Sequence, residues 1–535
     1  MTPILPYDVF PIIIGYLQHD RNTLFSCILV NRTMSILGIP LLWKNPFSSD
    51  ESYNMINNYQ TALLMRTYLS CLTEEERKYL TNKGVKIKNY RKPIFDYISF
   101  MKEITICETL YDSIICWILM EYYDYTKERL NDIKNFEQSN QSNEYKMQYT
   151  LINSLYHIIF KKNKVKSLKI SLYTIKFIYT IDYQFFMNTN ISLSNLNNLI
   201  ITLKDNNYNN NNEIIINQQS FEFLLDMIKK WCYKIKHIKI MNLLIFDNKR
   251  IPKIQEIVNQ QKNLLKLELF TSSNQNNENI IINNTLKSLR DNNNKFLTEI
   301  EIHDIDFSDI SILEGLISVN SLKSLLLSRC KGISIDNNYY ILYNSLIILN
   351  RLIFINNEFS LEFIISTIGK SLKELKTNQL DEESSNFIFQ NCSKTLTHLE
   401  LEINLNVQNL FYNLIKNLNL NHLKINCYKE STGIILNDLG FYLPKTLKYL
   451  GLIGLFNYNM NHLENLLSNC NIDLESLEIY GSINYNILTI ILNQIMKNKN
   501  IKSLIIDNNL NCKDWNEPEL SLLNDISKLV IMVIR

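Results

Sequence analysis

Glycine, paired cysteines, excess charge and long apolar runs are all scarce in this 535-residue sequence. It has only 11 glycines and no G-x-G-x-x-G or Walker-type motif, so we expect no loop that cradles phosphate groups and no nucleotide cofactor. The 10 cysteines are scattered singly, and no two form a C-x-x-C pair. This spacing argues against a zinc ribbon or a disulfide framework and favours reduced thiols.

The charge balance and the short apolar runs make two kinds of partner unexpected. With 55 basic and 53 acidic residues the formal net charge is +2, which gives no electrostatic reason to expect a nucleic-acid partner. The most apolar stretch, Ile114 to Met120, is far shorter than the roughly 20 residues that span a bilayer. The N-terminus has no basic region of the kind that begins a signal peptide. We therefore expect neither a membrane partner nor a secreted protein.

What the chain has in abundance is a repeat of the form apolar-x-x-Leu-x-apolar. Copies begin at Val165, Leu196, Ile235, Leu264, Leu297, Leu322, Leu349, Leu372, Leu396, Leu420, Leu447, Leu474 and Ile501, and a last copy begins at Ile526. Central residues are 23 to 27 positions apart from the fifth copy onward, and 29 to 39 apart before it. The longer early spacings contain Asn-rich inserts, which we expect to form loops.

This repeat predicts an α/β fold. In each copy two apolar residues lie two positions apart, as one face of a strand requires, and helical spacing fills the stretch between copies. Strands that alternate with helices must run parallel. The pattern resembles leucine-rich repeats, which implies a solenoid with strands on a concave face and helices on a convex face. Its length fits a repeat array, since one core stops growing at roughly 250 to 300 residues.

A few positions depart from the usual leucine-rich repeat. The family often places Asn or Cys three residues after the last apolar residue of the strand, and Cys330, Asn357 and Asn509 stand there. Most other copies lack such a residue, and Thr377 takes an apolar core position. We therefore expect an irregular solenoid.

The first 47 residues differ from the array and predict a small helical module. Val9, Ile13 and Leu17 share one helical stripe, and Asp20 can cap a second helix. Three short helices in about forty residues make only a marginal core, so such a unit usually needs a partner. The boundaries we predict are a helical module at 1–47, a helical connector at 48–160 and the repeat solenoid at 161–535.

The order of residues in this module resembles the F-box. The landmarks of that family are matched by Leu5, Pro6, Asp8, Val9, Ile13, Ile14, Leu17, Leu24, Val30, Arg32, Leu42 and Trp43. Two positions differ, with Asn31 where Cys is common and Met34 where Trp is common, and methionine can fill the space of an aromatic ring. The first hundred residues further resemble a fungal group of F-box-like proteins with leucine-rich repeats. An unrelated three-helix cap on the solenoid is the alternative.

Charged and aromatic residues beside the buried strand positions form the candidate target-binding set. Its members are Phe270, Glu301, His398, Glu400, His422 and Tyr449. His398 and His422 occupy the same position in successive copies, so parallel strands should hold them about 5 Å apart. They lack the three or four convergent ligands of a zinc site, so we predict no metal. Cys27 and Cys116 lie in apolar runs and indicate core packing, and we find no catalytic set.

The F-box resemblance implies a non-enzymatic function. It implies a substrate-recognition subunit of a Skp–cullin–F-box ubiquitin ligase, in the cytoplasm or nucleus, which marks targets for proteasomal degradation. The resemblance assigns adaptor binding to Leu5, Pro6, Val9, Ile13, Leu17 and Leu24, and target binding to the repeats. Two alternatives stay open, namely a leucine-rich-repeat scaffold with no role in ubiquitylation and an enzyme with a site built across repeats.

Overall fold

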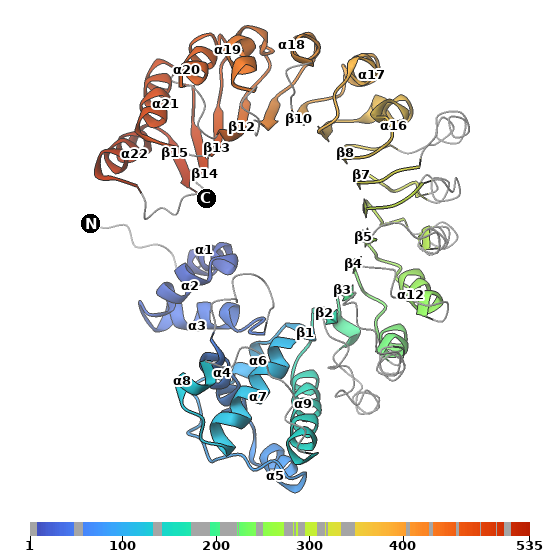
Figure 1. Ribbon diagram of the computed structural model, residues 1–535, viewed down its shortest axis with the longest axis vertical. Coiled ribbons are helices and arrows are strands. Elements are labelled where there is room, and N and C mark those ends of the chain that lie inside the picture. The colour runs from blue at the N-terminus through green and yellow to red at the C-terminus, as the bar shows by residue number, and fades with distance from the viewer. Residues whose placement is uncertain are drawn as a thin grey trace. The chain divides into compact units, whose positions relative to one another are not determined.

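The computed structural model describes residues 8–47, 57–106, 108–131, 142–172, 193–203, 222, 224–241, 250–271, 282, 285–286, 295–307, 316, 319–332, 348–402, 407–426, 432–455, 460–481, 483–498, 500–507 and 515–534. Repeat strands alternate with helices through most of this chain, and the helices α16 to α22 lie along one side of the strands β8 to β15 (Figure 1). By its contacts the chain divides into two compact units, Met1–Leu267 and Glu268–Arg535. The three-part domain boundaries stay a prediction.

A group of helices of different lengths precedes the repeat strands. It consists of α1 (Val9–Tyr16), the short 3-10 turn η1 (Leu17–His19), α2 (Arg21–Ile28), α3 (Arg32–Leu42), α4 (Asn58–Ser70), α5 (Glu74–Asn82), α6 (Tyr97–Phe100), α7 (Glu108–Tyr122), α8 (Lys127–Asn131) and α9 (Ser142–Lys162). Helix starts follow the sequence: Asp20 accepts a hydrogen bond from the Thr23 N–H at 3.0 Å, and Thr73 forms a capping box with Glu76.

The strands form one sheet whose spatial order is the order of the chain, β1 to β15. Thirteen of them coincide with the repeat copies: β2 (Ser167–Leu172), β3 (Asn198–Leu203), β4 (His237–Met241), β5 (Lys266–Phe270), β6 (Glu299–His303), β7 (Ser324–Ser328), β8 (Arg351–Ile355), β9 (Glu374–Thr377), β10 (His398–Glu402), β11 (His422–Asn426), β12 (Tyr449–Leu455), β13 (Ser476–Gly481) and β14 (Ser503–Asp507). The described pairings are all parallel and join corresponding residues of successive copies, such as Leu399 and Leu423. The α/β class and the parallel sheet of a leucine-rich-repeat solenoid are therefore confirmed.

Helices return the chain between strands where the sequence shows helical spacing. They are α12 (Arg250–Asn259), α16 (Leu361–Ile368), α17 (Glu382–Cys392), α18 (Gln408–Lys416), α19 (Thr432–Tyr442), α20 (Met460–Ser468), α21 (Tyr485–Lys497) and α22 (Glu517–Leu529). Their apolar faces and the second and fourth residues of the strands make the core, and Leu399, Leu401, Leu450 and Leu452 are almost fully buried. Each burial of a leucine side chain contributes about 1.5 to 3 kcal/mol.

Two strands differ from the sequence prediction. β1 (Glu103–Ile106) lies inside the connector that was expected to be helical, and it pairs with β2. Met101, Ile104 and Ile106 repeat the apolar spacing, but the partner residue of Ile104 is Leu168, too far along the chain for the repeat period to reveal this copy. At the other end, Ile526 belongs to α22, and β15 (Ile531–Ile534) begins five residues later than that copy does.

A polar residue at a turn position ties neighbouring repeats together. The Asn357 side chain is buried, accepts a hydrogen bond from the Cys330 N–H at 2.8 Å and donates one to the Leu327 carbonyl at 3.1 Å. This confirms the turn position predicted for Cys330 and Asn357, while Asn509 lies outside the described residues. The buried Thr377 keeps its hydroxyl bonded to the backbone of Gln379, at 3.0 Å from its N–H.

Candidate functional site

The N-terminal module has a small core made by one residue from each of its helices. Ile14 of α1, Leu24 of α2 and Ile39 of α3 are nearly fully buried. The Asn31 side chain begins α3 by accepting a hydrogen bond from the Met34 N–H at 2.9 Å. Gly38 allows α3 to approach α2, because a Cβ there would collide with Ile28. The module is therefore a folded three-helix unit with little interior.

The end of this module packs on the connector through aromatic rings. The Trp43 ring lies 4.1 Å from that of Tyr97 and 5.4 Å from that of Tyr68, measured between centroids. Phe47 adds a contact with Tyr68 at 5.2 Å. Tyr68 and Phe47 are buried, so this joint removes apolar surface from water. Trp43 is the last residue of the F-box-like pattern, and it packs the module against the connector.

The same segment also continues the backbone ladder of the sheet. Each repeat offers one carbonyl that accepts two N–H groups from the next repeat, as the Lys102 carbonyl does for Lys166 at 2.8 Å and Ser167 at 3.2 Å. The Lys44 carbonyl accepts in the same way from Lys102 at 3.0 Å and from Glu103 at 3.1 Å. A Lys44–Glu103 ion pair of 2.6 Å lies beside these bonds. The module therefore caps the first strand of the sheet.

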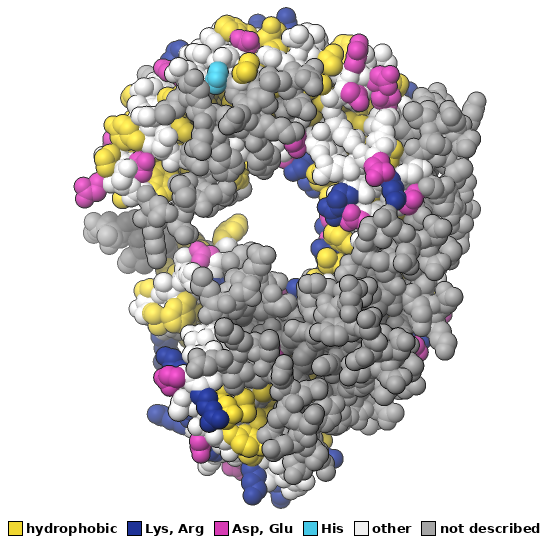
Figure 2. Space-filling view, viewed as in Figure 1, with side chains coloured by type: hydrophobic (Ala, Val, Ile, Leu, Met, Phe, Trp, Pro, Cys, Tyr) yellow, Lys and Arg dark blue, Asp and Glu magenta, His cyan; other side chains and the backbone are white. Residues whose placement is uncertain are grey.

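Capping leaves a large apolar surface of the module uncovered. Tyr16 is 83% exposed and Leu29 71% exposed, values that are unusual for such large side chains. Hydrophobic side chains are visible over α2 and α3 (Figure 2). We call this surface the module face, and its residues are Ile12, Ile13, Tyr16, Phe25, Leu29, Val30 and Ile36. Exposed apolar side chains gathered on one small unit make this surface a candidate binding site for a protein partner.

The adaptor residues implied by the resemblance fall into three groups. Leu5 and Pro6 lie outside the described residues. Val9 and Leu17 are half-buried, and Ile13 is 39% exposed, so part of each stripe residue reaches the surface. Leu24 is fully buried inside the module, and its assignment to adaptor binding stays a prediction. Tyr16, Leu29 and Val30 were missed because exposure cannot be read from apolar character.

The second candidate surface is the side of the sheet away from the helices, which we call the strand face. It carries the first and third residues of each strand, and many of them pair with the residue one strand along. Arg351 pairs with Glu374 at 2.8 Å, Lys376 pairs with Glu400 at 2.6 Å, and the Ser503 hydroxyl donates to that of Ser476 at 2.8 Å. The strand face of β8 to β14 is therefore lined with mutually paired side chains.

A stack of rings lies at the middle of this face. The His398 and His422 rings have centroids 5.1 Å apart, which agrees with the spacing expected from the sequence, and His422 lies 3.7 Å from Tyr449 at an angle of 10°. Burial, together with the smaller effect of the neighbouring His398, lowers the pKa of His422 to about 4. His422 is therefore neutral at pH 7, and the centre of the strand face carries no charge from it.

Beside the stack an ion pair bridges two strands that are not neighbours. The Lys424 ammonium of β11 lies 3.0 Å from a carboxylate oxygen of Glu478 on β13, and it also lies 5.0 Å from the Tyr480 ring. Gly451 of β12 stands between them, and a Cβ there would come within 3.0 Å of Lys424 and 3.2 Å of Glu478. The absence of a side chain at Gly451 makes room for the bridge, a relation that repeat spacing does not reveal.

The remaining target-binding candidates lie on the strand face as predicted. Phe270 of β5 stacks on His303 of β6, with ring centroids 3.9 Å apart and a 6° angle. Glu301 and Glu400 are half-buried third residues of β6 and β10. Whether any of these residues contacts a target stays a prediction.

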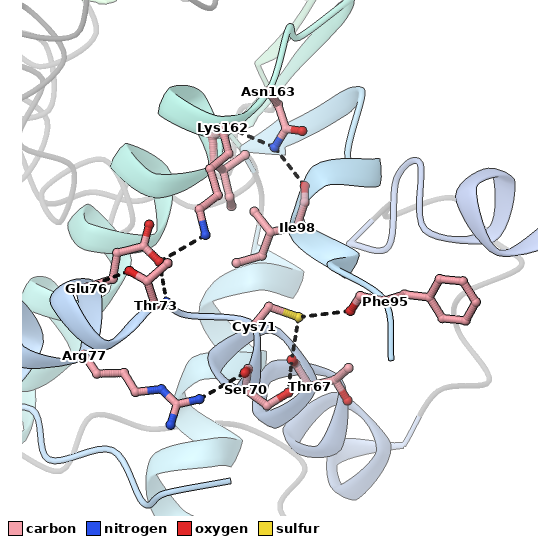
Figure 3. A network of polar contacts seen from close by, with 11 residues as sticks. Thr67, Ser70, Cys71, Thr73, Glu76, Arg77, Phe95, Ile98, Lys162 and Asn163 are labelled. Carbon is pink, nitrogen blue, oxygen red and sulfur yellow. Dashed lines mark hydrogen bonds and ion pairs between the residues drawn. The ribbon is translucent and has the colours of Figure 1, made fainter. Parts of the chain in front are cut away.

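A polar network holds the connector together (Figure 3). Lys162 of α9 pairs with Glu76 of α5 at 3.0 Å, and the buried Asn163 side chain donates to the Ile98 carbonyl at 2.8 Å. Arg77 donates to the Ser70 carbonyl at 3.0 Å, and the Cys71 thiol lies 3.8 Å from the Phe95 carbonyl. These contacts join α4, α5, α6 and α9, so the network fixes the helices of the connector to one another.

The described residues offer no cluster suited to binding a metal ion. Among them no group of three or more His, Cys, Asp or Glu side chains could hold a metal ion. Burial raises the pKa of the Cys116 thiol to about 12, consistent with core packing, and Cys27 is half-buried. No helix among the described residues is long and apolar enough to cross a membrane.

Comparisons with known proteins add little beyond this geometry. No family model matches the chain, and no curated protein matches it. A solved structure of the leucine-rich repeat-containing protein LegL7 from Legionella pneumophila is similar at 13% identity and a TM-score of 0.36, over 50% of this chain and 91% of that one. The assignment to a leucine-rich-repeat type of solenoid rests on the strand ladder described above.

Proposed function

We propose that this chain is the substrate-recognition subunit of a Skp–cullin–F-box ubiquitin ligase. The observation that carries the proposal is the module face: α1 and α2 leave Ile13, Tyr16 and Leu29 exposed although the end of the same module is packed on the connector. A small helical unit whose apolar residues face outward needs a partner to cover them. The order of F-box landmarks in the sequence suggests a Skp-type adaptor as that partner.

In this proposal the strand face holds the target protein. Its paired charges, ring stack and hydroxyls provide polar and aromatic contacts on a sheet of regular spacing. Such a subunit needs no catalytic residue, because it acts by raising the effective concentration of the target near the enzyme that carries ubiquitin. The chain would work through the adaptor and a cullin–RING complex, in the cytoplasm or nucleus.

A protein-binding scaffold without ubiquitylation is the second candidate, and one observation favours it. The Lys44 carbonyl and the Trp43 ring make the module a cap of the sheet, a role that is complete without an adaptor. Capping uses residues 43–47, whereas the module face lies on α1 to α3, so the two roles use different residues. Adaptor binding is therefore the measurement that separates the two candidates.

The test is a pull-down of purified Skp adaptor with the full chain and two matched double variants. Ile13→Ser with Tyr16→Ser alters the module face at two positions one helical turn apart, and we expect it to abolish capture, since few anchors carry most of an interface. Ile434→Ser with Phe441→Ser alters two exposed apolar residues of α19 and should leave capture unchanged. A further double variant, Leu5→Ala with Pro6→Ala, tests whether the first two residues of the F-box-like pattern contribute to adaptor capture.

Two outcomes of this experiment would contradict the proposal. If the unaltered chain captures no adaptor at micromolar concentration, the ligase role is excluded and the scaffold candidate replaces it. If both double variants lose adaptor equally while circular dichroism shows native structure, binding does not depend on the module face.

A further inference from the structure

A basic segment of the connector stands apart from both surfaces described so far. From Arg77 to Phe95 the chain has seven basic residues and no acidic one, in a protein whose formal net charge is only +2. The segment follows α5, has neither helix nor strand from Val85 to Pro93, and lies on the connector. Several Lys and Arg side chains are visible over this end of the connector, at the lower left of the view (Figure 2).

The four exposed cations that follow α5, other than Lys88, lack any charged partner among the described residues. Lys83, Lys86, Arg91 and Lys92 are exposed, and no carboxylate lies within ion-pair distance of them in the part of the chain that the structure describes. We call these four residues the basic ridge. The neighbouring Lys88 is different, because it pairs with the buried Glu121 at 2.8 Å, which raises the pKa of Lys88.

The backbone that carries the basic ridge is held in place by contacts on both sides. The Val85 N–H donates to the Leu80 carbonyl at 2.9 Å, and the Tyr122 hydroxyl donates to the Lys86 carbonyl at 2.6 Å. Val85 itself is fully buried. An ordered segment loses less conformational freedom on binding than a flexible one does, so its cations are pre-organised.

Side-chain contacts also anchor the second half of the segment. Arg77 donates to the Asn89 side chain at 2.9 Å, and the indole N–H of Trp117 donates to the Tyr90 hydroxyl at 3.2 Å. The Arg66 guanidinium covers the Tyr90 ring at 4.9 Å. The basic ridge thus contributes at most backbone atoms to this anchoring, as the Lys86 carbonyl does, and none of these anchoring contacts uses its cationic side chains.

The chemistry of the ridge selects among possible partners. Single-stranded nucleic acid binds where aromatic rings are free to stack on bases, but the Tyr90 ring is covered by Arg66 and its hydroxyl bonds Trp117. An amphipathic membrane contact uses several apolar residues beside the charges, whereas after α5 the segment exposes one, Ile94, at 94%, and Tyr79 on α5 is 40% exposed. Complementary charge on an ordered, irregular segment favours an extended polypeptide with several carboxylates.

We propose that the basic ridge binds a carboxylate-rich, extended segment of a partner protein. Each Asp or Glu side chain of the partner would take the place of solvent at one of the four unpaired cations. This surface is separate from the module face and from the strand face, and its role does not depend on whether an adaptor binds α1. It gives the chain a selectivity for acidic partners that its near-neutral total charge conceals.

The test measures binding of a fluorescein-labelled peptide of six Glu-Ser repeats to the full chain by fluorescence anisotropy. Lys83→Gln, Lys86→Gln, Arg91→Gln and Lys92→Gln are combined in one variant, and we expect its Kd to rise about 10- to 30-fold, since exposed ion pairs are individually weak. A control variant removes the same charge elsewhere, at Lys262, Lys394, Lys416 and Lys445, which are exposed too. The control should retain binding within about twofold, and added salt should weaken the complex.

Other outcomes would overturn the proposal. If a matched Gln-Ser peptide binds equally well, carboxylates are not what the ridge recognises. If the Glu-Ser peptide shows no binding at about 100 micromolar, a concentration at which even a weak complex is detected, the site is excluded. If an oligouridine RNA or vesicles that contain phosphatidylserine bind in place of the peptide, the ridge is assigned to that class of partner. In the vesicle case Ile94→Ser should also reduce binding, whereas it should leave peptide binding unchanged.

Discussion

The repeats and the N-terminal module use apolar residues in opposite ways. In β8 to β14 the second and fourth strand positions point into the core, and nearly all are apolar and almost fully buried. In the module Ile14, Leu24 and Ile39 are buried, whereas Tyr16, Leu29 and Val30 are mostly exposed. Similar apolar content therefore gives a self-sufficient core in one region and an uncovered surface in the other. We therefore expect the module, rather than the repeats, to depend on a partner.

Substitutions in the repeat core should have the largest effect on the free energy of unfolding. Leu399→Ala or Leu450→Ala removes a side chain that is no more than 1% exposed, and we expect a loss of about 2 to 5 kcal/mol in the free energy of unfolding. Urea denaturation followed by circular dichroism measures this loss. Tyr16→Ser or Leu29→Ser in the module should change it by less than about 0.5 kcal/mol. Equal losses in the two regions would break the comparison.

A smaller effect should come from the one polar tie between repeats that the sequence predicted. Asn357→Ala leaves the Cys330 N–H and the Leu327 carbonyl without their partner inside the protein, which costs about 1 to 3 kcal/mol. Asn417→Ala is the control, because its exposed amide bonds only to the Asn413 carbonyl within its own helix. A loss at Asn357 no greater than at Asn417 would show that the turn bonds do not stabilise the array.

The smallest effect concerns the strand face and depends on pH. The pKa of His422 is about 4 in the folded chain and near 6.5 when unfolded, so the unfolded chain binds the proton more tightly between these values. Stability linked to His422 is therefore complete above about pH 6.5 and is lost as the pH falls toward 4. We expect about 1 to 2 kcal/mol, after a reduction for solvent screening at this half-buried ring.

The measurement compares the urea midpoint at pH 7 and pH 4.5 for the unaltered chain and for His422→Gln. The unaltered chain should lose more stability than the variant does over this interval, because the variant cannot take up the proton. Identical pH dependence in both proteins would mean that His422 does not titrate differently in the folded and unfolded states.

The repeat period predicted the parallel sheet because each copy carries its own strand signal. Thirteen strands begin two residues after the start of their copies, and the His398–His422 contact follows directly from that register. Features that involve the backbone alone gave no signal. The capping carbonyl of Lys44 could carry any side chain, and the space at Gly451 matters only because Lys424 and Glu478 lie on either side of it.

The two misplaced strands have a common cause. The partner strand of β1 is far along the chain, with Ile104 opposite Leu168, so no period links the two strands. Near the end of the chain a capping box at Asn516 and Glu519 begins α22, and the helix continues through Ile526. In both places local helix signals and changed spacing outweighed the repeat pattern. The exposure of the module face also could not be predicted, because the sequence does not show which apolar residues of a small unit stay at its surface.

The mutual pairing of side chains on the strand face sets a threshold for anything that binds there. A protein that contacts Lys376, Glu400 or Lys424 must offer a group that replaces the partner each already has, or leave a charge unsatisfied. Casual encounters with other proteins gain less from such residues, because part of their charge is already compensated within the sheet. We therefore expect the strand face to resist non-specific association. Only a protein surface that offers matching groups to several strands at once should bind there.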